Sequence, residues 1–307
     1  MRVAFLGTSP FACPALQVLA GEHEIVYIGT QPDRPAGRRR ALKPSAVKTL
    51  AEELDLAVHQ PIKINREEAV AELHQARPDV TVVAAYGQIL RPAVFDVPRL
   101  GTINIHASLL PAYRGAAPVR WAVTRGETTT GVTTFLIDAG MDTGDILLKR
   151  SLDIGPNETA GELEERLAAL GAEAILETLA GLEAGTLTAQ PQPEEGVTYA
   201  PILKREDGRV DWSDSAMAAH NRVRGMSPWP GAWTSLGETR IKLLRSIRTR
   251  IGAGRAEPGA VALPETGRLL IACGDELLEI LEVQREGRPR TDGRSFLNGL
   301  QPGTRFE

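Results

Sequence analysis

The sequence predicts an α/β protein: a Rossmann-like, doubly wound and mostly parallel sheet, followed by a small C-terminal OB-like β-barrel domain. Up to about residue 184, short apolar runs of strand length alternate with segments of helical periodicity, as in parallel α/β sheets. From residue 204 on, several short strands separated by Gly and Pro turns follow one helix, a pattern typical of a small barrel.

The first half begins as strand, turn and helix. Residues 2–6 are apolar, and the turn after them leads into a helix with Ser9 as N-cap and Pro10 at the first helical position. The turn lacks G-x-G-x-x-G, so no dinucleotide is expected. Further strands are predicted at 24–29, near 58, at 80–84, 101–106, 131–137 and 146–152, and helices at 11–19, 45–54, 66–76 (capped by Asn65), 117–124 and 159–183.

The order of these elements predicts two domains joined by a linker. Residues 1–184 form the first domain, and residues 185–203, which include a stretch rich in Pro, Gln and Glu, form the exposed linker. Residues 204–307 form the barrel domain, with a helix near 215–224 and strands near 231–236, 239–247, 259–263, 268–272 and 277–283. Trp229 and Trp233 are interpreted as barrel core in preference to base-stacking platforms.

Composition is that of a soluble globular protein, with 42% hydrophobic and 24% charged residues among 307. The sequence has no run of about 18 apolar residues and no signal-peptide pattern, so we expect a cytoplasmic protein and no membrane partner. Cys13 and Cys273 are far apart in apolar surroundings, and we expect two reduced thiols.

Charge is distributed unevenly. The net charge of −4 argues against a general nucleic-acid binder, but residues 1–203 carry −7 (18 Lys/Arg, 25 Asp/Glu) and residues 204–307 carry +3 (17 and 14). Within residues 31–48 the single acidic Asp33 accompanies six basic residues: Arg34, Arg38, Arg39, Arg40, Lys43 and Lys48. This pattern is expected where a polyanion lies across a basic loop and a basic second domain. A solvated, mobile run of charges is the alternative.

The strand predicted at 101–106 ends in two polar side chains. Asn104 and His106 are two positions apart, so they point to one face of the strand while Ile103 and Ile105 point to the other. An imidazole exchanges a proton near neutral pH, and a carboxamide donates to an oxygen that gains charge. The pair therefore suits carbonyl chemistry at the carboxyl edge of the sheet. The alternative is that both side chains only cap the strand.

Longer motifs connect this pair to a known family. The block NIHASLLPAYRGAAP (104–118) and the turn DAGMDTGDIL (138–147) resemble the N10-formyltetrahydrofolate formyltransferases. GTSPFA near the start, QPDRPAGRRRALKPSAVK (31–48) and SPWPGAW (227–233) are similar to the branch of this family that acts on methionyl-tRNA. The similarity runs over nearly the whole chain.

The resemblance implies roles for particular residues. The family's catalytic triad corresponds to Asn104, His106 and Asp142, the last being the aspartate of the D-T-G step and not Asp138 or Asp145. The family's folate-binding segment corresponds to Ser108, Leu109, Leu110 and Pro111. Contacts with tRNA are expected from Arg38, Arg39, Arg40 and Lys43.

The implied reaction moves the formyl group of 10-formyltetrahydrofolate, a co-substrate, to the free amino group of methionine on initiator tRNA, giving formylmethionyl-tRNA for translation initiation. Asn104 and a protonated His106 would stabilise the tetrahedral oxyanion, while Asp142 would hold the ring and relay the amine's proton. No metal is expected, because the five histidines show no ligand spacing, and we expect a monomer.

Two other functions fit part of the pattern. A catalytically silent RNA-binding module with the same fold is disfavoured because Asn104, His106 and Asp142 are all present. A formyltransferase that acts on a small amine would have no evident use for the basic stretch and the barrel domain.

Overall fold

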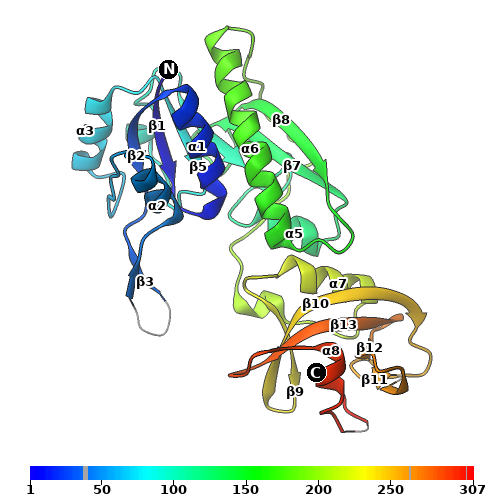
Figure 1. Ribbon diagram of the computed structural model, residues 1–307. Coiled ribbons are helices and arrows are strands. Elements are labelled where there is room, and N and C mark those ends of the chain that lie inside the picture. Colours follow the sequence, from blue (N-terminus) through cyan, green and yellow to red (C-terminus); the bar gives the residue numbers. More distant parts are fainter. Residues whose placement is uncertain (37–40, 263, 302) are drawn as a thin grey trace. The chain divides into compact units, whose positions relative to one another are not determined.

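The computed structural model describes residues 1–36, 41–262, 264–301 and 303–307. Its fold is of the predicted class: a mixed, mostly parallel sheet with helices, followed along the chain by a curled antiparallel sheet (Figure 1). The chain forms two compact units that are not continuous in sequence. The first comprises Met1–Gly115, Gly131–Leu152 and Glu164–Tyr199, and the second Ala116–Thr130, Asp153–Leu163 and Ala200–Glu307.

The sheet of the first unit has the strand order β2-β1-β5-β6-β7-β8. Its strands are β1 (Arg2–Gly7), β2 (Glu24–Gly29), β5 (Val80–Ala84), β6 (Thr102–His106), β7 (Thr129–Leu136) and β8 (Ile146–Asp153). β1 pairs in parallel with β2 and β5, and β5 pairs in parallel with β6, whereas β7 runs antiparallel to β6. Every residue of β5 is buried, as expected for a parallel strand covered on both faces.

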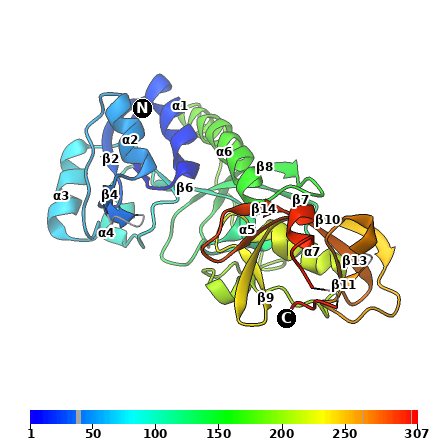
Figure 2. The same ribbon diagram turned by 60° about the horizontal axis from the view of Figure 1, so that its bottom comes forward.

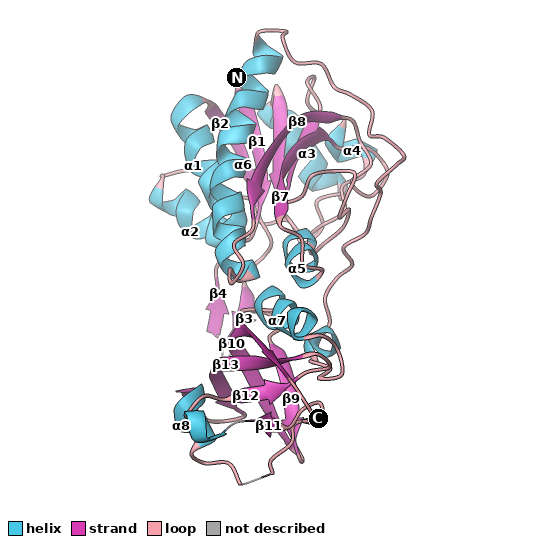
Figure 3. Ribbon diagram, turned by 90° about the vertical axis from the view of Figure 1, so that its right-hand side faces the viewer, coloured by secondary structure: helices cyan, strands magenta, loops and turns pink. Residues whose placement is uncertain are grey.

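Helices cover both faces of this sheet (Figure 3). A 3-10 turn (Pro10–Ala12) leads into α1 (Cys13–Glu22), which lies with α2 (Ala46–Glu53) and α6 (Ala160–Glu183) on one face, whereas α3 (Glu67–Ala76) and α4 (Pro92–Phe95) lie on the other. α6 approaches β6 closely at Gly171, where a Cβ atom would lie 2.9 Å from Ile105 Cγ2. The absence of a side chain at Gly171 therefore permits close packing of α6 on the sheet.

The parallel strands end at one edge of the sheet, where hydrogen bonds connect their turns. Val83 of β5 lies opposite Asn104 of β6. After β5, the carbonyl oxygen of Tyr86 accepts hydrogen bonds from Thr8 Oγ1 after β1 (2.7 Å) and from Gln31 Nε2 after β2 (3.3 Å). These bonds build a continuous surface at the carboxyl edge, the place where open α/β sheets bind ligands.

Two local predictions in the first unit were wrong. The described chain near residue 58 has no strand, only a single bridge between Gly29 and His59. α3 begins after Arg66, and Asn65 does not cap it. The Asn65 side chain instead donates to Ile89 O (2.8 Å) and accepts from Arg91 N (2.9 Å), because a loop from elsewhere in the fold competes for its hydrogen bonds.

The basic stretch, predicted as a loop, contains a short antiparallel hairpin of β3 (Arg34–Ala36) and β4 (Ala41–Lys43). Asp33 forms an ion pair with Lys48 (2.8 Å), and Ser45 caps α2 by accepting from Lys48 N (3.0 Å). Residues 37–40 between the two strands lie outside the described residues.

The second unit contains a curled antiparallel sheet of order β11-β12-β13-β10-β9, with β14 paired to β13 (Figure 2). Its strands are β9 (Ala232–Leu236), β10 (Thr239–Gly252), β11 (Val261–Ala262), β12 (Leu270–Ala272), β13 (Glu276–Arg285) and β14 (Arg290–Asp292). α7 (Ala216–Gly225) packs on β10 and against α5 (Pro118–Thr124), and α8 (Gly293–Leu297) follows β14. Further 3-10 turns span Arg205–Gly208 and Pro264–Thr266.

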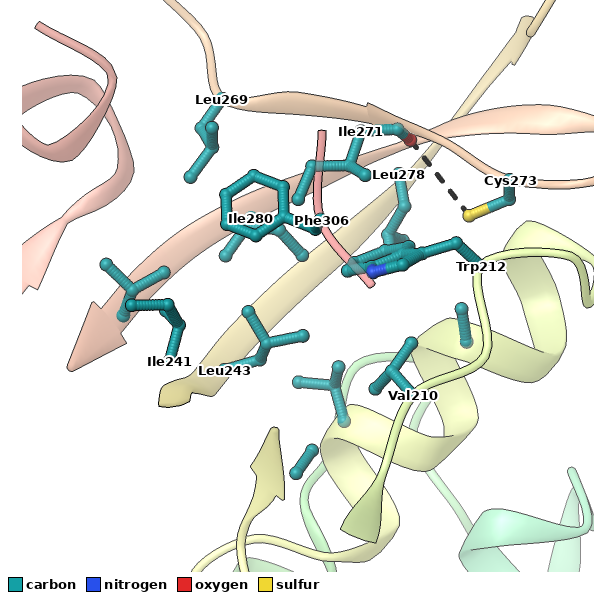
Figure 4. Packing of buried hydrophobic residues seen from close by; sticks show 14 of the residues in the cluster. Val210, Trp212, Ile241, Leu243, Leu269, Ile271, Cys273, Leu278, Ile280 and Phe306 are labelled. Atoms are coloured by element: carbon teal, nitrogen blue, oxygen red, sulfur yellow. Dashed lines mark hydrogen bonds between the residues drawn. The ribbon is translucent and has the colours of Figure 1, made fainter. Parts of the chain in front are cut away.

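The core of the second unit gathers around Trp212 and Phe306 (Figure 4). Leu243 of β10 and Leu278 of β13 point into the same cluster. Cys273, 1% exposed, belongs to it, and burial raises the pKa of its thiol to about 12. Both cysteines are free, as predicted.

The segment predicted as a linker, 185–203, is divided between the units: 185–199 belongs to the first and 200–203 to the second. Gln190 and Ile146 exchange two backbone hydrogen bonds of 2.7 and 2.8 Å, and Thr198 O accepts from Arg114 N at 2.9 Å. Most of the segment is therefore held on the first unit and is not a free linker. Backbone hydrogen bonds leave no hydrophobic pattern in the sequence, which is why the composition alone indicated a linker.

Candidate active site

β6 carries two of the predicted site residues to the carboxyl edge of the sheet. Ile105 faces α6, so Asn104 and His106, at alternate positions, face the opposite side. His106 is 5% exposed, and Asn104 is half-buried. The Asn104 carboxamide has no hydrogen-bond partner among the described residues, so its N–H donors remain free for a ligand.

The imidazole ring of His106 is fixed on two sides. Its Nε2 donates to the carbonyl oxygen of Tyr113 at 2.9 Å, and the ring of Phe135 packs edge-on against it with centroids 6.3 Å apart. A carbonyl oxygen can only accept, so Nε2 carries a hydrogen in this arrangement. Nδ1 is therefore the ring nitrogen that can contact a ligand.

Asp142 reaches the ring from the turn between β7 and β8. It has a left-handed φ of 54°, a conformation that Asp and Asn adopt more readily than most residues. Its Oδ2 accepts from Gly115 N at 2.7 Å and lies 3.8 Å from His106 Nδ1. That distance is too long for a direct hydrogen bond but short enough for strong Coulomb attraction.

The neighbouring aspartates, Asp138 and Asp145, do not contact His106. Asp138 accepts from Thr143 Oγ1 (2.7 Å) and Gly140 N (3.0 Å), which closes the turn on itself, and the side chain of Asp145 is exposed. A Cβ atom at Gly144 would collide with the carbonyl oxygen of Leu136, so the glycine of the D-T-G step is required for this turn. The structure therefore brings Asp142, and neither of its neighbours, to His106.

Sequence reasoning missed Gln192, which secures this turn. Its Nε2 donates to the carbonyl oxygens of Asp142 and Gly144 at 2.8 Å each, and its Oε1 accepts from Arg114 Nε (3.1 Å) and Nη2 (2.6 Å). Arg114 is 9% exposed and directly precedes the residue that donates to Asp142. One carboxamide thus connects the two loops that flank His106. A glutamine in a Pro- and Glu-rich stretch gives no periodic or motif signal.

The predicted folate-binding segment follows His106 directly. The side chains of Ser108 and Leu110 are both 0% exposed. Thr133 Oγ1 donates to Ser108 O (2.7 Å) and accepts from Leu110 N (3.1 Å), which fixes the main chain on β7. Only Leu109 and Pro111 keep partly exposed side chains. A ligand would therefore meet these two side chains and the main chain, and not the Ser108 hydroxyl.

The residues predicted to contact tRNA are placed only in part. Lys43 is exposed at the end of β4, whereas Arg38, Arg39 and Arg40 lie outside the described residues.

The interpretation of Trp229 and Trp233 as barrel core was wrong. Trp229 is 54% exposed, and Trp233 in β9 is half-buried. Trp229 stands in the Pro-flanked turn before β9, outside the alternation that directs side chains of a strand into the core.

Across the described ranges, no group of three or more His, Cys, Asp and Glu residues is placed to hold a metal ion. In the same part of the chain no helix has the length and apolar character needed to cross a membrane.

The three polar side chains converge from the end of β6 and from the turn between β7 and β8. The Asn104 carboxamide and His106 Nδ1 can donate to an oxygen that becomes negatively charged, and the Asp142 carboxylate beside them can accept a proton. The arrangement suits addition of an external nucleophile to a carbonyl carbon, because it supplies oxyanion donors and a proton acceptor.

This chain belongs to the formyl transferase family. Residues 1–179 match the family described as formyl transferase, and residues 202–301 match the family's C-terminal domain. Two relatives named methionyl-tRNA formyltransferase are similar over essentially the whole length. The protein of Solibacter usitatus (strain Ellin6076) is 50% identical over 300 residues, covering 97% of this chain and 96% of its own. That of Geobacter sulfurreducens is 48% identical over 310 residues, covering 100% and 96%.

Solved structures agree on the fold at lower identity. The N-formyltransferase of Helicobacter canadensis, in complex with folinic acid and dTDP-3-aminofucose, has a TM-score of 0.70 at 18% identity, covering 91% of this chain and 98% of its own. HypX of Aquifex aeolicus, in complex with tetrahydrofolic acid, has a TM-score of 0.65 at 19% identity. The match covers 97% of this chain and 47% of HypX.

Proposed function

We propose that this protein transfers the formyl group of 10-formyltetrahydrofolate to the free amino group of methionine on initiator tRNA. The observation that carries the proposal is the cluster of Asn104, His106 and Asp142 in a chain collinear with relatives named methionyl-tRNA formyltransferase. The product, formylmethionyl-tRNA, serves translation initiation.

The amine is itself the nucleophile, so the chain needs no covalent intermediate. Its attack on the formyl carbon turns the carbonyl oxygen into an oxyanion. The Asn104 carboxamide and a protonated His106, through Nδ1–H, would donate to this oxygen, while the Tyr113 carbonyl holds the ring by Nε2. Removing one such donor typically costs about 3 kcal/mol in the barrier.

The tetrahedral intermediate must move a proton from the attacking amine to N10 before the C–N10 bond breaks. Asp142 would accept this proton through water and return it to the departing N10. The Gly115 N–H already donates to Oδ2, so Oδ1 is the oxygen that would accept the proton. The negative charge of Asp142, 3.8 Å from Nδ1, would also offset positive charge that develops on the ring during the reaction.

The folate would lie along the carboxyl edge beside these residues. Leu109 and Pro111 offer partly exposed apolar side chains, and Ile89, in the segment after β5, is 87% exposed. β5 is the neighbour of β6 in the sheet, so these apolar surfaces are suited to a flat aromatic ring.

The same proposal implies which parts of the chain bind tRNA and in which compartment the enzyme works. Residues 1–184 would carry the catalysis, 204–307 would bind tRNA, and Arg38, Arg39, Arg40 and Lys43 would meet its phosphates. Initiator tRNA is used by cytoplasmic ribosomes, so we expect the enzyme in the cytoplasm. Sedimentation at micromolar concentration tests the predicted monomer.

The decisive experiment is incubation with 10-formyltetrahydrofolate and methionyl-initiator tRNA, followed by separation of formylated from free aminoacyl-tRNA. We expect formylation of the charged tRNA and none of a panel of small amines. The His106→Ala variant should lose more than nine tenths of kcat while tRNA affinity stays nearly unchanged, because His106 acts at the formyl carbon. Efficient formylation of a small amine, without transfer to the tRNA, would contradict the proposal.

A further inference from the structure

The second unit contains a pocket of about 360 Å³ that the catalytic mechanism does not use. Two indoles, Trp229 and Trp233, and four cations, Arg205, Arg240, Lys242 and Arg285, line it. All of these residues belong to the same unit.

The antiparallel sheet builds one side of this pocket. Lys242 of β10 lies opposite Trp233 of β9 and opposite Gln284 of β13, so three side chains from three strands stand in one row on one face. Ile241 and Leu243, which flank Lys242, are buried in the core on the other face. The row is therefore the outer surface of the sheet.

The cations of the pocket have no carboxylate partner among the described residues. Arginines elsewhere in the same unit are paired: Arg248 with Glu276 and Arg268 with Glu279. None of the four pocket cations forms such a pair within the described ranges, although the carboxylate of Glu286 also lines the pocket. An excess of unpaired positive charge around one hollow favours an anionic ligand.

The two indoles are held differently. The Nε1 of Trp233 donates to Arg205 O at 2.9 Å, and the guanidinium of Arg240 lies over its ring at 4.1 Å from the centroid. The main chain of Trp229 is fixed by a hydrogen bond of 3.0 Å from Arg120 Nε to Trp229 O, yet 54% of the residue is exposed. Trp229 thus presents a large aromatic surface from a fixed backbone.

We propose that this pocket binds one unpaired nucleotide of the tRNA substrate, with its base stacked on Trp229 and its phosphate groups held by Lys242 and Arg240. An exposed aromatic ring beside unpaired cations is the combination that recognises single-stranded nucleic acid. The inference rests on the proposed function, from which the tRNA follows. A free mononucleotide has the same chemistry, but the spread of four cations suits a chain with successive phosphates.

The test measures binding of initiator tRNA to the full-length protein at several salt concentrations. Trp229→Ala is expected to weaken binding roughly 5- to 150-fold, the effect of removing one base–aromatic stack, and Trp229→Phe to retain most of the affinity. Lys242→Ala should lower the slope of log K against log salt by about 0.7–0.9, because one phosphate is no longer neutralised. Tryptophan fluorescence should be quenched by tRNA in the wild type and less so in Trp229→Phe.

Arg255→Ala is the matched control, because it removes one exposed positive charge from the same unit outside the pocket. It should leave both affinity and salt slope close to wild type. Circular dichroism shows whether each variant is folded. If Trp229→Ala fails to fold, Trp229→Phe quenching and Lys242→Ala carry the test, since Lys242 is exposed.

Two outcomes overturn the proposal. Wild-type tRNA affinity, salt slope and quenching in the pocket variants would exclude the pocket from tRNA binding. Saturation of Trp229 by free AMP without any competition against tRNA would assign the pocket to a free nucleotide. Both results leave the proposed function intact if the wild type formylates methionyl-tRNA, whereas a wild type that neither binds nor formylates this tRNA would refute the function itself.

Discussion

Replacing Asp142 with asparagine removes one charge from the site and changes little else. Asparagine tolerates the left-handed φ of 54° as well as aspartate does, and its Oδ1 can still accept from Gly115 N. The variant therefore isolates the electrostatic effect of the carboxylate on His106.

The distance sets the size of this effect. Two unit charges 3.8 Å apart attract by about 1 kcal/mol in water and by about 4 kcal/mol at an effective dielectric constant of about 20. The side chains of His106 and Asp142 are 6% and 19% exposed, so the upper part of this range applies. If the ring must carry a proton in the transition state, kcat should fall by about two to three orders of magnitude.

The assay is the single-turnover rate of formyl transfer from pH 5 to pH 9. Loss of the carboxylate should alter the pH–rate profile, because it removes the proposed proton acceptor. Asp138→Asn is the matched control, because it removes a charge from the same turn without facing His106. A rate within tenfold of wild type and an unaltered profile in Asp142→Asn would refute the assigned role.

Three further changes test other parts of the molecule. Replacing Arg38, Arg39 and Arg40 together with alanine should weaken tRNA binding and lower its salt slope by about 0.7–0.9 log units for each phosphate that is no longer neutralised; a wild-type KM for tRNA and slope would favour the alternative of a solvated charge run. Gln192→Leu leaves the Arg114 side chain and two carbonyl oxygens without the hydrogen bonds of the carboxamide. Urea denaturation should show a free energy of unfolding lower by about 1–3 kcal/mol, and kcat should decrease with a smaller change in KM. Unchanged values would show that water replaces the Gln192 carboxamide. Burial lowers the pKa of His220 from its ordinary value of 6.5. Just below that pH, His220 is therefore protonated in the unfolded chain but neutral in the folded chain. The free energy of unfolding should fall as the pH drops through this range, and His220→Gln should remove the contribution of His220 to this pH dependence. Denaturation at several pH values measures both effects.

The local features of this protein follow from its sequence. The strands predicted at 24–29 and 80–84 are present with those bounds. The common orientation of Asn104 and His106 follows from the two-residue period of a strand, and Ser45 caps α2 through a side-chain bond to the main chain three residues on. Such features depend on interactions within a few residues, which a single sequence displays.

Only the tertiary structure decided which distant groups meet. β7 runs antiparallel to β6 and ends opposite Ile103, so Asp142 lies beside His106 only because the turn after β7 folds back towards the end of β6. Gln192 joins this turn to the loop after β6 by hydrogen bonds to carbonyl oxygens. The exposure of Trp229 likewise depends on how its turn leaves the sheet. Contacts of this kind couple segments tens of residues apart through polar atoms common to every residue, so they leave no periodic trace in the sequence and arise only when the chain is packed.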